Sequence, residues 1–262
     1  MYIERYGTGE RIYFGLHGWS GDHTTFAPLR DYLPGEATLY SADLPGYGRS
    51  PAPRRWELSA IIDEICACVS SMGLHQVTII GNCSGGILGV LTAARLSTQI
   101  ERLVMIDPFA YVPWYFKVFV ETSFGKYAYY STFANPLGRW LTNLSLSRHR
   151  QPETSLTASF ASVNHEASYQ YLVLLSQIGG IDQLPQIQTP MEIGYGARTF
   201  GAVKKSIVHW QHRYPQARRW ELAGAGHLPL AEATEQLSRM IFGAASDLHS
   251  TEEHHLSSTI KE

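Results

Sequence analysis

The sequence lacks the features that mark disulfide-bonded, secreted and membrane-spanning proteins. Its three cysteines are too few, and odd in number, for a disulfide framework, and Cys66 and Cys68 fall on one predicted helix. No run of about eighteen apolar residues occurs, and residues 1–5 have neither the basic start nor the apolar core of a signal peptide. We therefore expect a soluble, cytoplasmic protein in which Cys83 is free to react.

A strong charge of either sign is also absent. Lys and Arg number 21 against 23 Asp and Glu, a formal net charge of −2, which gives no reason to expect a nucleic-acid or membrane partner. A hydrophobic content of 44% in 262 residues is enough to bury a full core. Residues 244–262 are expected to form a flexible polar tail, whose paired His254 and His255 lack the further partners of a metal site.

Residues 78–86 are the stretch around which the rest of the chain is organised. A short apolar run ends at Gly81, one residue intervenes, the candidate nucleophile Cys83 follows, and Gly85 opens a helix two residues later. A nucleophile in such a strand-to-helix turn has a strained backbone, so the residues two before and two after it must be small. The two glycines meet this requirement, and the sequence predicts Cys83 as the nucleophile.

The neighbouring Ser84 is the alternative nucleophile in this stretch. Its flanking positions would be Asn82 and Gly86. An Asn side chain is too large for the position two residues before a nucleophile in this kind of turn. We therefore favour the cysteine.

Strand-like and helix-like segments alternate along most of the chain. Such alternation is typical of a mostly parallel sheet with helices on both faces, and it puts ligands at the carboxyl ends of the strands. The expected fold class is α/β. Expected strands span residues 11–16, 38–42, 76–80, 102–106, 189–196 and 216–222, and expected helices span residues 24–33, 57–72, 85–96, 203–213 and 230–242.

Four motifs follow one another along these segments. They are His-Gly-Trp from His17, Asp-Leu-Pro-Gly-Tyr-Gly-Arg-Ser from Asp43, Gly-Asn-Cys-Ser-Gly-Gly from Gly81, and Gly-Ala-Gly-His ending at His227. In order and spacing they resemble the α/β-hydrolases of the esterase, haloperoxidase and pimeloyl-carrier methyl-esterase type, over about residues 10–110 and 185–243. The resemblance implies an α/β-hydrolase fold, a mostly parallel central sheet flanked by helices, with a helical cap insertion.

The resemblance also implies a role for each motif. The loop after His17 is an oxyanion loop, in which the backbone N–H of Trp19 faces the developing negative charge and Ser84 supplies the second N–H. His17 itself orients that loop and borders the substrate pocket. His227, in a glycine-rich loop after the last strand, is the general base. The loop from Asp43 is architectural rather than catalytic.

The acid of the expected triad departs from the family pattern. Such enzymes usually carry it as Gly-x-x-Asp after the strand that ends here at Gly196, and this chain has Thr199 at that position. Asp107, at the end of the strand that follows the elbow helix, is the predicted replacement, and Asp182 is a second candidate. A thiol depends less on an acid than a hydroxyl does, because a free thiol ionises at about pH 8.5.

Residues 109–184 interrupt the alternation and separate the core segments 1–108 and 185–243. In the resembled family an insertion at this point forms a helical cap over the active site. Ten aromatic residues lie between positions 111 and 133, and helix-like stretches follow at 156–163 and 165–178. Most of these aromatic side chains are expected to pack the cap on the sheet, and the rest to line an apolar pocket. The pocket candidates are Trp114, Tyr115, Phe116 and Phe119.

A cysteine in the elbow also resembles two branches, the dienelactone hydrolases and the polyhydroxyalkanoate synthases. The resemblance implies a hydrolase that cleaves an ester, thioester or lactone with an apolar acyl group through a Cys83 thioester and a Cys-His-Asp triad. An acyltransferase or cyclase using the same intermediate stays open, because amines and thiols attack thioesters readily. A non-hydrolytic ligand-binding or lyase-type member stays open as well, on account of Thr199.

The expected partner is a small-molecule acyl substrate, free or carrier-bound. Arg148, His149 and Arg150 in the cap are candidates to meet a phosphopantetheine group or an acidic carrier, with a solvated charge cluster as the alternative. No motif predicts a cofactor or a metal. His209 and His212, three residues apart on a predicted helix, are interpreted as an exposed face.

Overall fold

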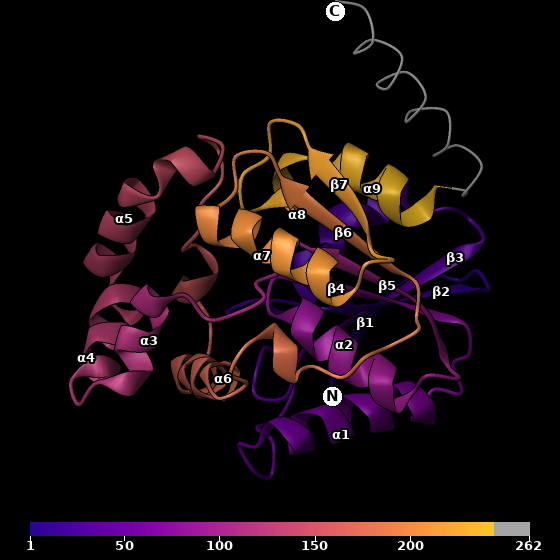
Figure 1. Ribbon diagram of the computed structural model, residues 1–262, viewed down its shortest axis with the longest axis horizontal. Coiled ribbons are helices and arrows are strands. Elements are labelled where there is room, and N and C mark those ends of the chain that lie inside the picture. The colour runs from indigo at the N-terminus through magenta and orange to yellow at the C-terminus, as the bar shows by residue number, and fades with distance from the viewer. Residues whose placement is uncertain (244–262) are drawn as a thin grey trace, which may run out of the picture.

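The computed structural model describes residues 1–243, and within them seven strands form one sheet in the order β1-β3-β2-β4-β5-β6-β7 (Figure 1). β1 runs antiparallel to β3, and all other neighbouring strands are parallel. This topology confirms the mostly parallel α/β sheet. The expected tail and its paired histidines lie outside the described residues. The strands are β1 (Ile3–Gly7), β2 (Arg11–Leu16), β3 (Ala37–Ala42), β4 (Val77–Asn82), β5 (Ile100–Ile106), β6 (Met191–Gly196) and β7 (Arg218–Leu222).

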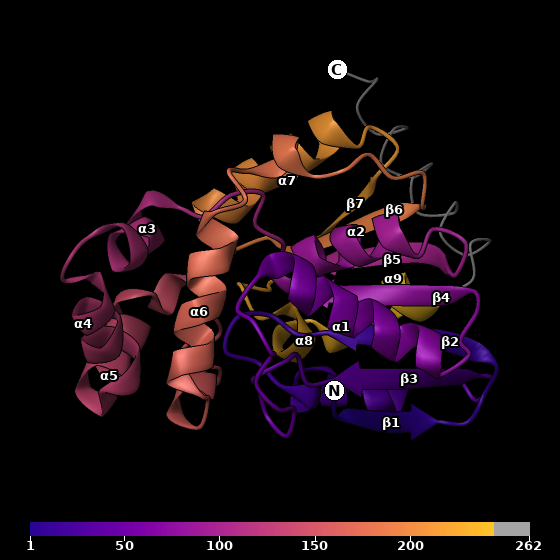
Figure 2. The same cartoon turned by 90° about the horizontal axis from the view of Figure 1, so that it is seen from below.

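Helices cover both faces of the sheet (Figure 2). One face packs against α1 (Leu58–Ser71), α2 (Gly85–Arg95) and α7 (Gly201–Arg213), whose apolar side chains join the larger core cluster. The other face packs against α9 (Thr234–Phe242) and the 3-10 helix His23–Tyr32. The central strands are apolar along most of their length because they are buried on both sides. Within residues 1–243, no helix has the length and apolar character needed to cross a bilayer.

Three expected boundaries differ in the structure. β1 was not expected, since Ile-Glu-Arg-Tyr-Gly carries too little apolar pattern, and it forms an edge strand through backbone pairing with β3. The expected closing helix is two helices, α8 (Pro229–Glu232) and α9, separated at Ala233, whose ψ of 40° is not helical. Finally, residues 156–163 contain only the 3-10 turn Ser159–Ala161.

The last difference has a local cause in side-chain hydrogen bonds. The backbone N–H of Leu156 donates to the Asn143 side chain at 3.0 Å, and the Thr157 hydroxyl donates to the carbonyl of Arg139 at 3.2 Å. The Ser159 hydroxyl bonds the Ser20 hydroxyl at 2.7 Å. These bonds hold the segment against its neighbours and compete with a helix of its own.

The cap lies between β5 and β6 and stands beside the carboxyl ends of the parallel strands (Figure 2). Its small core consists of Tyr129, Phe133 and Phe160, with Trp19 of the oxyanion loop packed against them. The indole N–H of Trp19 also donates to the carbonyl of Ser168 at 2.8 Å. The cap helices are α3 (Trp114–Glu121), α4 (Gly125–Tyr129), the π-helical turn Tyr130–Ala134, α5 (Pro136–Ser145), the 3-10 turn Ser147–His149, α6 (His165–Ser176) and the 3-10 turn Ile181–Gln183.

The elbow between β4 and α2 is packed as tightly as the sequence predicts. A methyl group at Gly81 would lie 2.5 Å from the carbonyl oxygen of Gly85. A methyl group at Gly85 would lie 2.1 Å from the carbonyl oxygen of Leu16. Backbone atoms cannot withdraw as a flexible side chain can, so α2 approaches β2 this closely only because glycine occupies both positions.

Gly85→Ala tests this close approach by the sign of its effect. Helix propensity alone predicts stabilisation, because alanine is about 1 kcal/mol better than glycine in a helix. The collision with the Leu16 carbonyl instead predicts a loss of about 1 to 3 kcal/mol in unfolding free energy. Urea denaturation measures the difference. Gly35→Ala is the matched control, since a methyl group there meets no atom within 4 Å; equal effects of the two changes would refute the packing argument.

Candidate active site

Cys83 occupies the turn between β4 and α2 with a φ of 51°, in the left-handed region that non-glycine residues seldom adopt. Its backbone N–H donates to the carbonyl of Ile106 at 2.8 Å, which ties the turn to the end of β5. A methyl group at Gly18 would lie 2.8 Å from the Cys83 β-carbon. The thiol side of the turn faces a cavity, whereas Cys66 and Cys68 lie on α1, away from that cavity. The geometry is that of a nucleophile held in a strained turn.

The two N–H groups predicted for the oxyanion are available. Among residues 1–243, neither the backbone N–H of Trp19 nor that of Ser84 donates to any acceptor. Both residues line the cavity beside Cys83, and Ser84 directly precedes α2, so the partial positive charge of the helix N-terminus adds to its N–H. Both residues therefore keep an uncommitted backbone N–H at the cavity that Cys83 lines.

His17 lies beneath the oxyanion loop and not in the substrate pocket, contrary to the expectation that it borders the pocket. Its ring is fully buried, and Nε2 accepts the backbone N–H of Leu44 at 3.0 Å. Nδ1 therefore carries the proton and donates to the carbonyl of Gly18 at 2.8 Å. Burial lowers the pKa of His17 to about 4, so the ring is neutral. It links the oxyanion loop to the Asp43 loop and thereby orients it.

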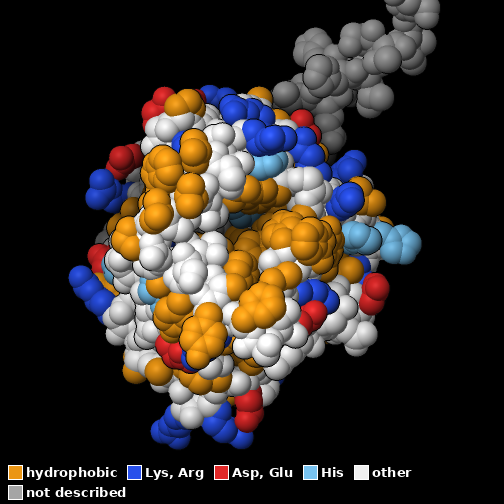
Figure 3. Space-filling model, turned by 90° about the vertical axis from the view of Figure 1, so that its left-hand side faces the viewer, with side chains coloured by type: hydrophobic (Ala, Val, Ile, Leu, Met, Phe, Trp, Pro, Cys, Tyr) orange, Lys and Arg blue, Asp and Glu red, His pale blue; other side chains and the backbone are white. Residues whose placement is uncertain are grey.

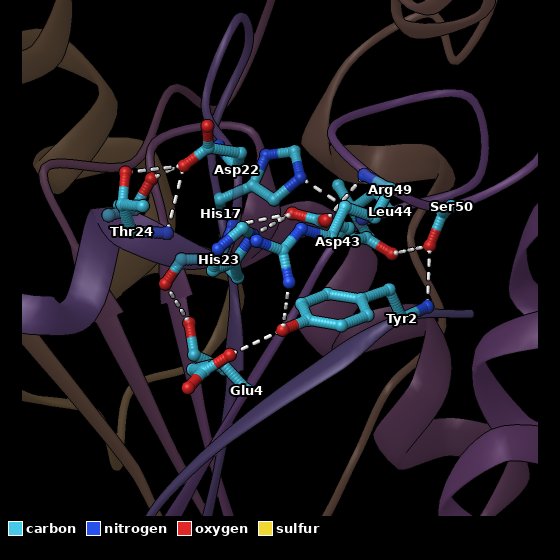
Figure 4. Close-up of polar contacts among 12 residues, drawn as sticks. Tyr2, Glu4, His17, Asp22, His23, Thr24, Asp43, Leu44, Arg49 and Ser50 are labelled. Atoms are coloured by element: carbon cyan, nitrogen blue, oxygen red, sulfur yellow. Dashed lines mark hydrogen bonds and ion pairs between the residues drawn. The ribbon is translucent and has the colours of Figure 1, made fainter.

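The Asp43 loop is held by its own buried carboxylate (Figure 4). One oxygen of Asp43 accepts the backbone N–H of His23 at 2.6 Å and its ring Nδ1 at 2.9 Å, and the other accepts the backbone N–H of Arg49 at 2.7 Å. Asp22, His23 and Asp43 offer ligand atoms within 4.8 Å of one another, an arrangement open to a metal. Because loop hydrogen bonds already occupy both Asp43 oxygens, we assign the cluster an architectural role.

Asp107 and His227 meet at the carboxyl edge of the sheet. The buried Asp107 follows β5 with a φ of 50°, and its Oδ2 accepts a hydrogen bond from His227 Nδ1 at 2.5 Å. Its other oxygen accepts the backbone N–H of Gly196, at the end of β6, at 2.9 Å. Asp182 lies exposed in the turn Ile181–Gln183. The acid that contacts the histidine is the one on β5.

Thr199 holds this carboxylate. Its hydroxyl donates to Asp107 Oδ2, the oxygen that also receives the histidine proton, and its side chain is buried. It lies 3.5 Å from His227 Nδ1. The residue at the family's usual acid position therefore donates a hydrogen bond to the acid, which here lies at the end of a different strand.

His227 has an unusually high proton affinity. Burial by itself lowers the pKa of His227, but hydrogen bonds to Asp107 and to Cys83, together with the negative charges of both, outweigh it and raise the pKa to about 10. The ring is therefore an imidazolium at neutral pH, set between a carboxylate and the sulfur. This arrangement favours a charged histidine beside Cys83.

The loop that carries His227 is fastened to the cap, a feature that the sequence did not reveal. The backbone N–H of His227 donates to the carbonyl of His149 at 2.8 Å. The carboxylate of Glu232 accepts the backbone N–H of Gly226 at 2.5 Å and that of Gln151 at 2.8 Å. Glu232 therefore joins the base loop to the cap. Its only sequence signal was an acid five residues after the histidine, which is too common to be diagnostic.

A cavity of about 930 Å³ extends from Cys83 and His227 into the cap. Of the four expected pocket side chains, Tyr115, Phe116 and Phe119 line it, whereas Trp114 does not and is 76% exposed. Trp114 begins α3, and the helix turns its indole outward. Asp22 is the only carboxylate in the lining, which contains no Lys or Arg within the described residues. Further apolar lining comes from Ile87, Phe109, Val112, Phe133, Phe160, Val163, Leu172, Leu175 and Ile178.

Of the remaining polar candidates, His149 lines the cavity and packs against Phe200, which in turn packs against His227. The others do not line the cavity. Arg150 donates through Nη1 to the carbonyls of three cap residues, at 2.6 to 3.0 Å, and so braces its own loop. Arg148 is exposed. His209 and His212 are side chains on α7, and His209 packs edge-on against Tyr111.

The structure thus places a thiol in a strand-to-helix turn and a histidine paired with a buried acid at one edge of an α/β sheet. A family model described as the alpha/beta hydrolase fold matches residues 15–234, and the chain belongs to that family.

Individual relatives are similar over shorter stretches. "Lipase LipV" of Mycobacterium tuberculosis is 29% identical over 109 residues, 41% of this chain and 41% of its own. A "pimeloyl-[acyl-carrier protein] methyl ester esterase" of Neisseria meningitidis is 29% identical over 101 residues, 38% of this chain and 37% of its own. The chain thus spans about two fifths of the length of these curated relatives.

Solved structures match over nearly the whole chain. The structure titled "Crystal structure of VinJ" has a TM-score of 0.73 at 19% identity and covers 91% of this chain and 92% of its own. A thermophilic esterase from Thermogutta terrifontis has a TM-score of 0.71 at 20% identity and covers 92% and 90%. At these identities the likeness shows the fold.

Thr199→Val tests the role of the threonine as a positioning residue. Removing its hydroxyl leaves the shared Asp107 oxygen with one donor fewer, and hydrogen bonds to charged groups are worth about 1.5 to 3 kcal/mol. We expect kcat on a soluble ester to fall about tenfold with little change in KM, and Thr199→Ser to restore it. Thr92→Val is the matched control, because the buried Thr92 hydroxyl has no partner among the described residues. An unchanged kcat in Thr199→Val would remove the assigned role.

The raised pKa of His227 predicts how stability depends on pH. Between pH 6.5 and about 10 the folded protein keeps the proton that the unfolded chain releases. The contribution is therefore full below about pH 6.5 and is lost as the pH rises through about 10. We expect the unfolding free energy of Cys83→Ala, in which no thiol exchanges a proton, to fall by about 1 to 3 kcal/mol more than that of Cys83→Ala/His227→Gln between pH 6.5 and 9.5, in urea titrations. Parallel profiles would contradict the raised pKa.

Proposed function

We propose that the protein hydrolyses an ester, thioester or lactone with an apolar acyl group, through a covalent thioester on Cys83. The observation that carries the proposal is the contact chain from Asp107 through His227 to Cys83, at the end of a largely apolar cavity. Relatives named as a lipase, a serine hydrolase and a methyl ester esterase support an ester as the substrate class.

The charge state of His227 favours cysteine chemistry in this site. A serine nucleophile needs a neutral histidine that accepts its proton, and an imidazolium cannot do so. A thiolate is already the attacking form, and a neighbouring imidazolium stabilises it. The raised pKa of His227, which keeps the ring positively charged, therefore favours a sulfur nucleophile over a hydroxyl at this position.

The reaction proceeds in two steps. The Cys83 sulfur attacks the acyl carbonyl, and the N–H groups of Trp19 and Ser84 stabilise the resulting oxyanion. Collapse of the intermediate breaks the bond to the leaving alcohol or thiol, which takes its proton from His227. The neutral His227 then removes a proton from water, whose oxygen attacks the thioester carbonyl. Collapse of this second intermediate breaks the carbon–sulfur bond and releases the carboxylic acid. The imidazolium and the thiolate are thereby restored.

The cavity lining sets the expected acyl preference. Aromatic and aliphatic side chains of the cap surround the space next to Cys83, no Lys or Arg lines it among residues 1–243, and the charge of His227 is already paired with Asp107. A carboxylate or phosphate on the acyl group would be buried there without a counter-charge, at a large cost. We therefore propose an uncharged, apolar acyl group, with any carrier or other charged portion outside the cavity.

An acyltransferase or cyclase reaction is the second candidate. A volume of about 930 Å³ is at the upper end of the range for small-molecule sites, with room for an acyl group and a second reactant. Hydroxyl side chains gather in part of the cavity, which suits a polar acceptor; they are Thr132, Thr142, Ser145, Ser155, Thr157, Ser159 and Ser162. If an added alcohol or amine raises turnover while water competes poorly, transfer is the right description. A ligand-binding or lyase-type role would survive only if Cys83→Ala and His227→Ala leave activity unchanged.

Trapping the acyl-enzyme tests the covalent proposal. In His227→Ala, activated p-nitrophenyl esters and acyl thioesters still acylate Cys83, since their leaving groups need no protonation, but deacylation lacks its base. We expect intact-mass analysis to show one acyl group added, mapped by peptide analysis to Cys83 and not to Cys66 or Cys68. The double variant Cys83→Ala/His227→Ala should stay unmodified. The thioester would be ruled out if the wild-type protein turns the substrate over while His227→Ala forms no adduct. It would also be ruled out if Cys83→Ala retains turnover.

A further inference from the structure

The exposed apolar side chains of the molecule are concentrated on the cap. Ten large hydrophobic side chains are exposed within residues 1–243, and eight of them belong to residues 114–144. We call these eight the cap face: Trp114, Tyr115, Phe124, Tyr127, Leu137, Trp140, Leu141 and Leu144. Scattered exposed hydrophobics are ordinary, but a gathering of this kind on one side of a protein marks an interaction surface.

Helix α5 shows that the concentration follows from the sequence pattern. Its four cap-face residues recur at positions 137, 140, 141 and 144, the spacing of one helical face, and each is more than half exposed. Thr142, Ser145 and the following Leu146 line the cavity instead. The helix therefore turns its polar side toward the cavity and its apolar side toward solvent, the reverse of the usual arrangement for a surface helix.

The cap face adjoins the mouth of the cavity. Tyr115 belongs both to the exposed set and to the cavity lining. In Figure 3, groups of hydrophobic side chains surround a hollow in this side of the molecule. Apolar surface thus continues from the outside of the cap into the cavity that ends at Cys83.

Arginines without acidic partners accompany this surface. Residues 109–184 contain five Lys and Arg and four Asp and Glu, and both lysines are paired, Lys117 with Glu121 and Lys126 with Glu166. Arg139, Arg148 and Arg150 form no salt bridge within the described residues. An exposed apolar helix face with tryptophan and flanking cations is the pattern of a helix that lies in the surface of an anionic lipid layer.

We propose that the cap face binds the surface of an anionic lipid layer and that the protein takes its apolar substrate from that layer into the cavity. The binding step stands by itself, and the uptake step rests on the proposed function. The near-neutral net charge of the chain had given no reason to expect a membrane partner. A net charge carries no information about where the folded cap exposes apolar side chains.

A second copy of the chain is a poorer occupant of this face. Two copies joined through surfaces that border their cavity mouths would close both mouths against substrate. A lipid layer instead leaves the mouth facing the phase in which apolar acyl compounds collect.

Vesicle binding tests the proposal without requiring catalysis. Full-length Cys83→Ala protein is floated with vesicles of phosphatidylcholine containing one third phosphatidylglycerol, and total tryptophan fluorescence is followed for a blue shift, to which the exposed Trp114 and Trp140 should contribute most. We expect binding, several-fold weaker on pure phosphatidylcholine, and at least about tenfold weaker for Leu141→Glu/Leu144→Glu. Neither leucine lines the cavity, so this double change in the otherwise wild-type chain should keep its turnover of a water-soluble short-chain ester. Val208→Glu, a charge added at an exposed apolar residue of α7, should bind as the parent does.

Each outcome decides the proposal. Absence of binding to either vesicle, or equal binding by the double variant, would overturn it, and equal binding to both compositions would overturn the anionic preference. A dimer that Leu141→Glu/Leu144→Glu dissociates, with no vesicle binding, would identify the face as a contact between copies. Because vesicle binding is measured in Cys83→Ala, failure to trap an acyl-enzyme would leave the lipid result standing, and loss of vesicle binding would leave the thioester result standing.

Discussion

The hydrogen bond between Asp107 and His227 is the contact on which the site depends. It joins the loop after β5 to the loop after β7 across the end of β6, and it forms because parallel neighbouring strands end at the same edge of the sheet. A buried carboxylate is costly unless it is paired. Asp107 meets this condition through His227, the Gly196 N–H and the Thr199 hydroxyl, so the acid, the base and the residue at the usual acid position form one connected group.

The relocated acid and the cysteine are consistent with each other. With the acid on β5, the carboxylate still reaches His227 Nδ1, and the ring keeps its other nitrogen for Cys83. The high pKa of His227 then favours a standing imidazolium. Such a ring suits a sulfur nucleophile, which attacks as an anion, better than a hydroxyl, which must lose its proton during attack. Two departures from the family pattern thus describe one chemical arrangement.

The parts of the fold and site that the sequence predicted are those fixed by local geometry. Steric limits at the elbow pointed to Cys83, and glycine-rich turns after strands pointed to His227; the structure pairs His227 with Asp107 and places Cys83 and His227 on one cavity. Side-chain direction and long-range contacts could not be predicted in this way. Trp114 was expected inside the pocket and faces solvent, and His17 was expected beside the pocket and lies buried beneath the oxyanion loop. In both cases the sequence placed the residue near the site, but the direction of the side chain depends on packing that the sequence pattern does not show.

The cap is part of the catalytic framework as well as a cover. Its carbonyl at His149 receives the backbone N–H of His227, and Glu232 binds the base loop and the cap backbone at once. A displacement of the segment from His149 to Gln151 would therefore move His227 through these backbone hydrogen bonds, with the sheet unchanged. The opposite side of the cap carries the exposed apolar face, and α5 separates that face from the cavity. A ligand on the outside of α5 and a substrate in the cavity would therefore contact opposite sides of one helix, which ends four residues before the carbonyl of His149 that accepts the His227 N–H.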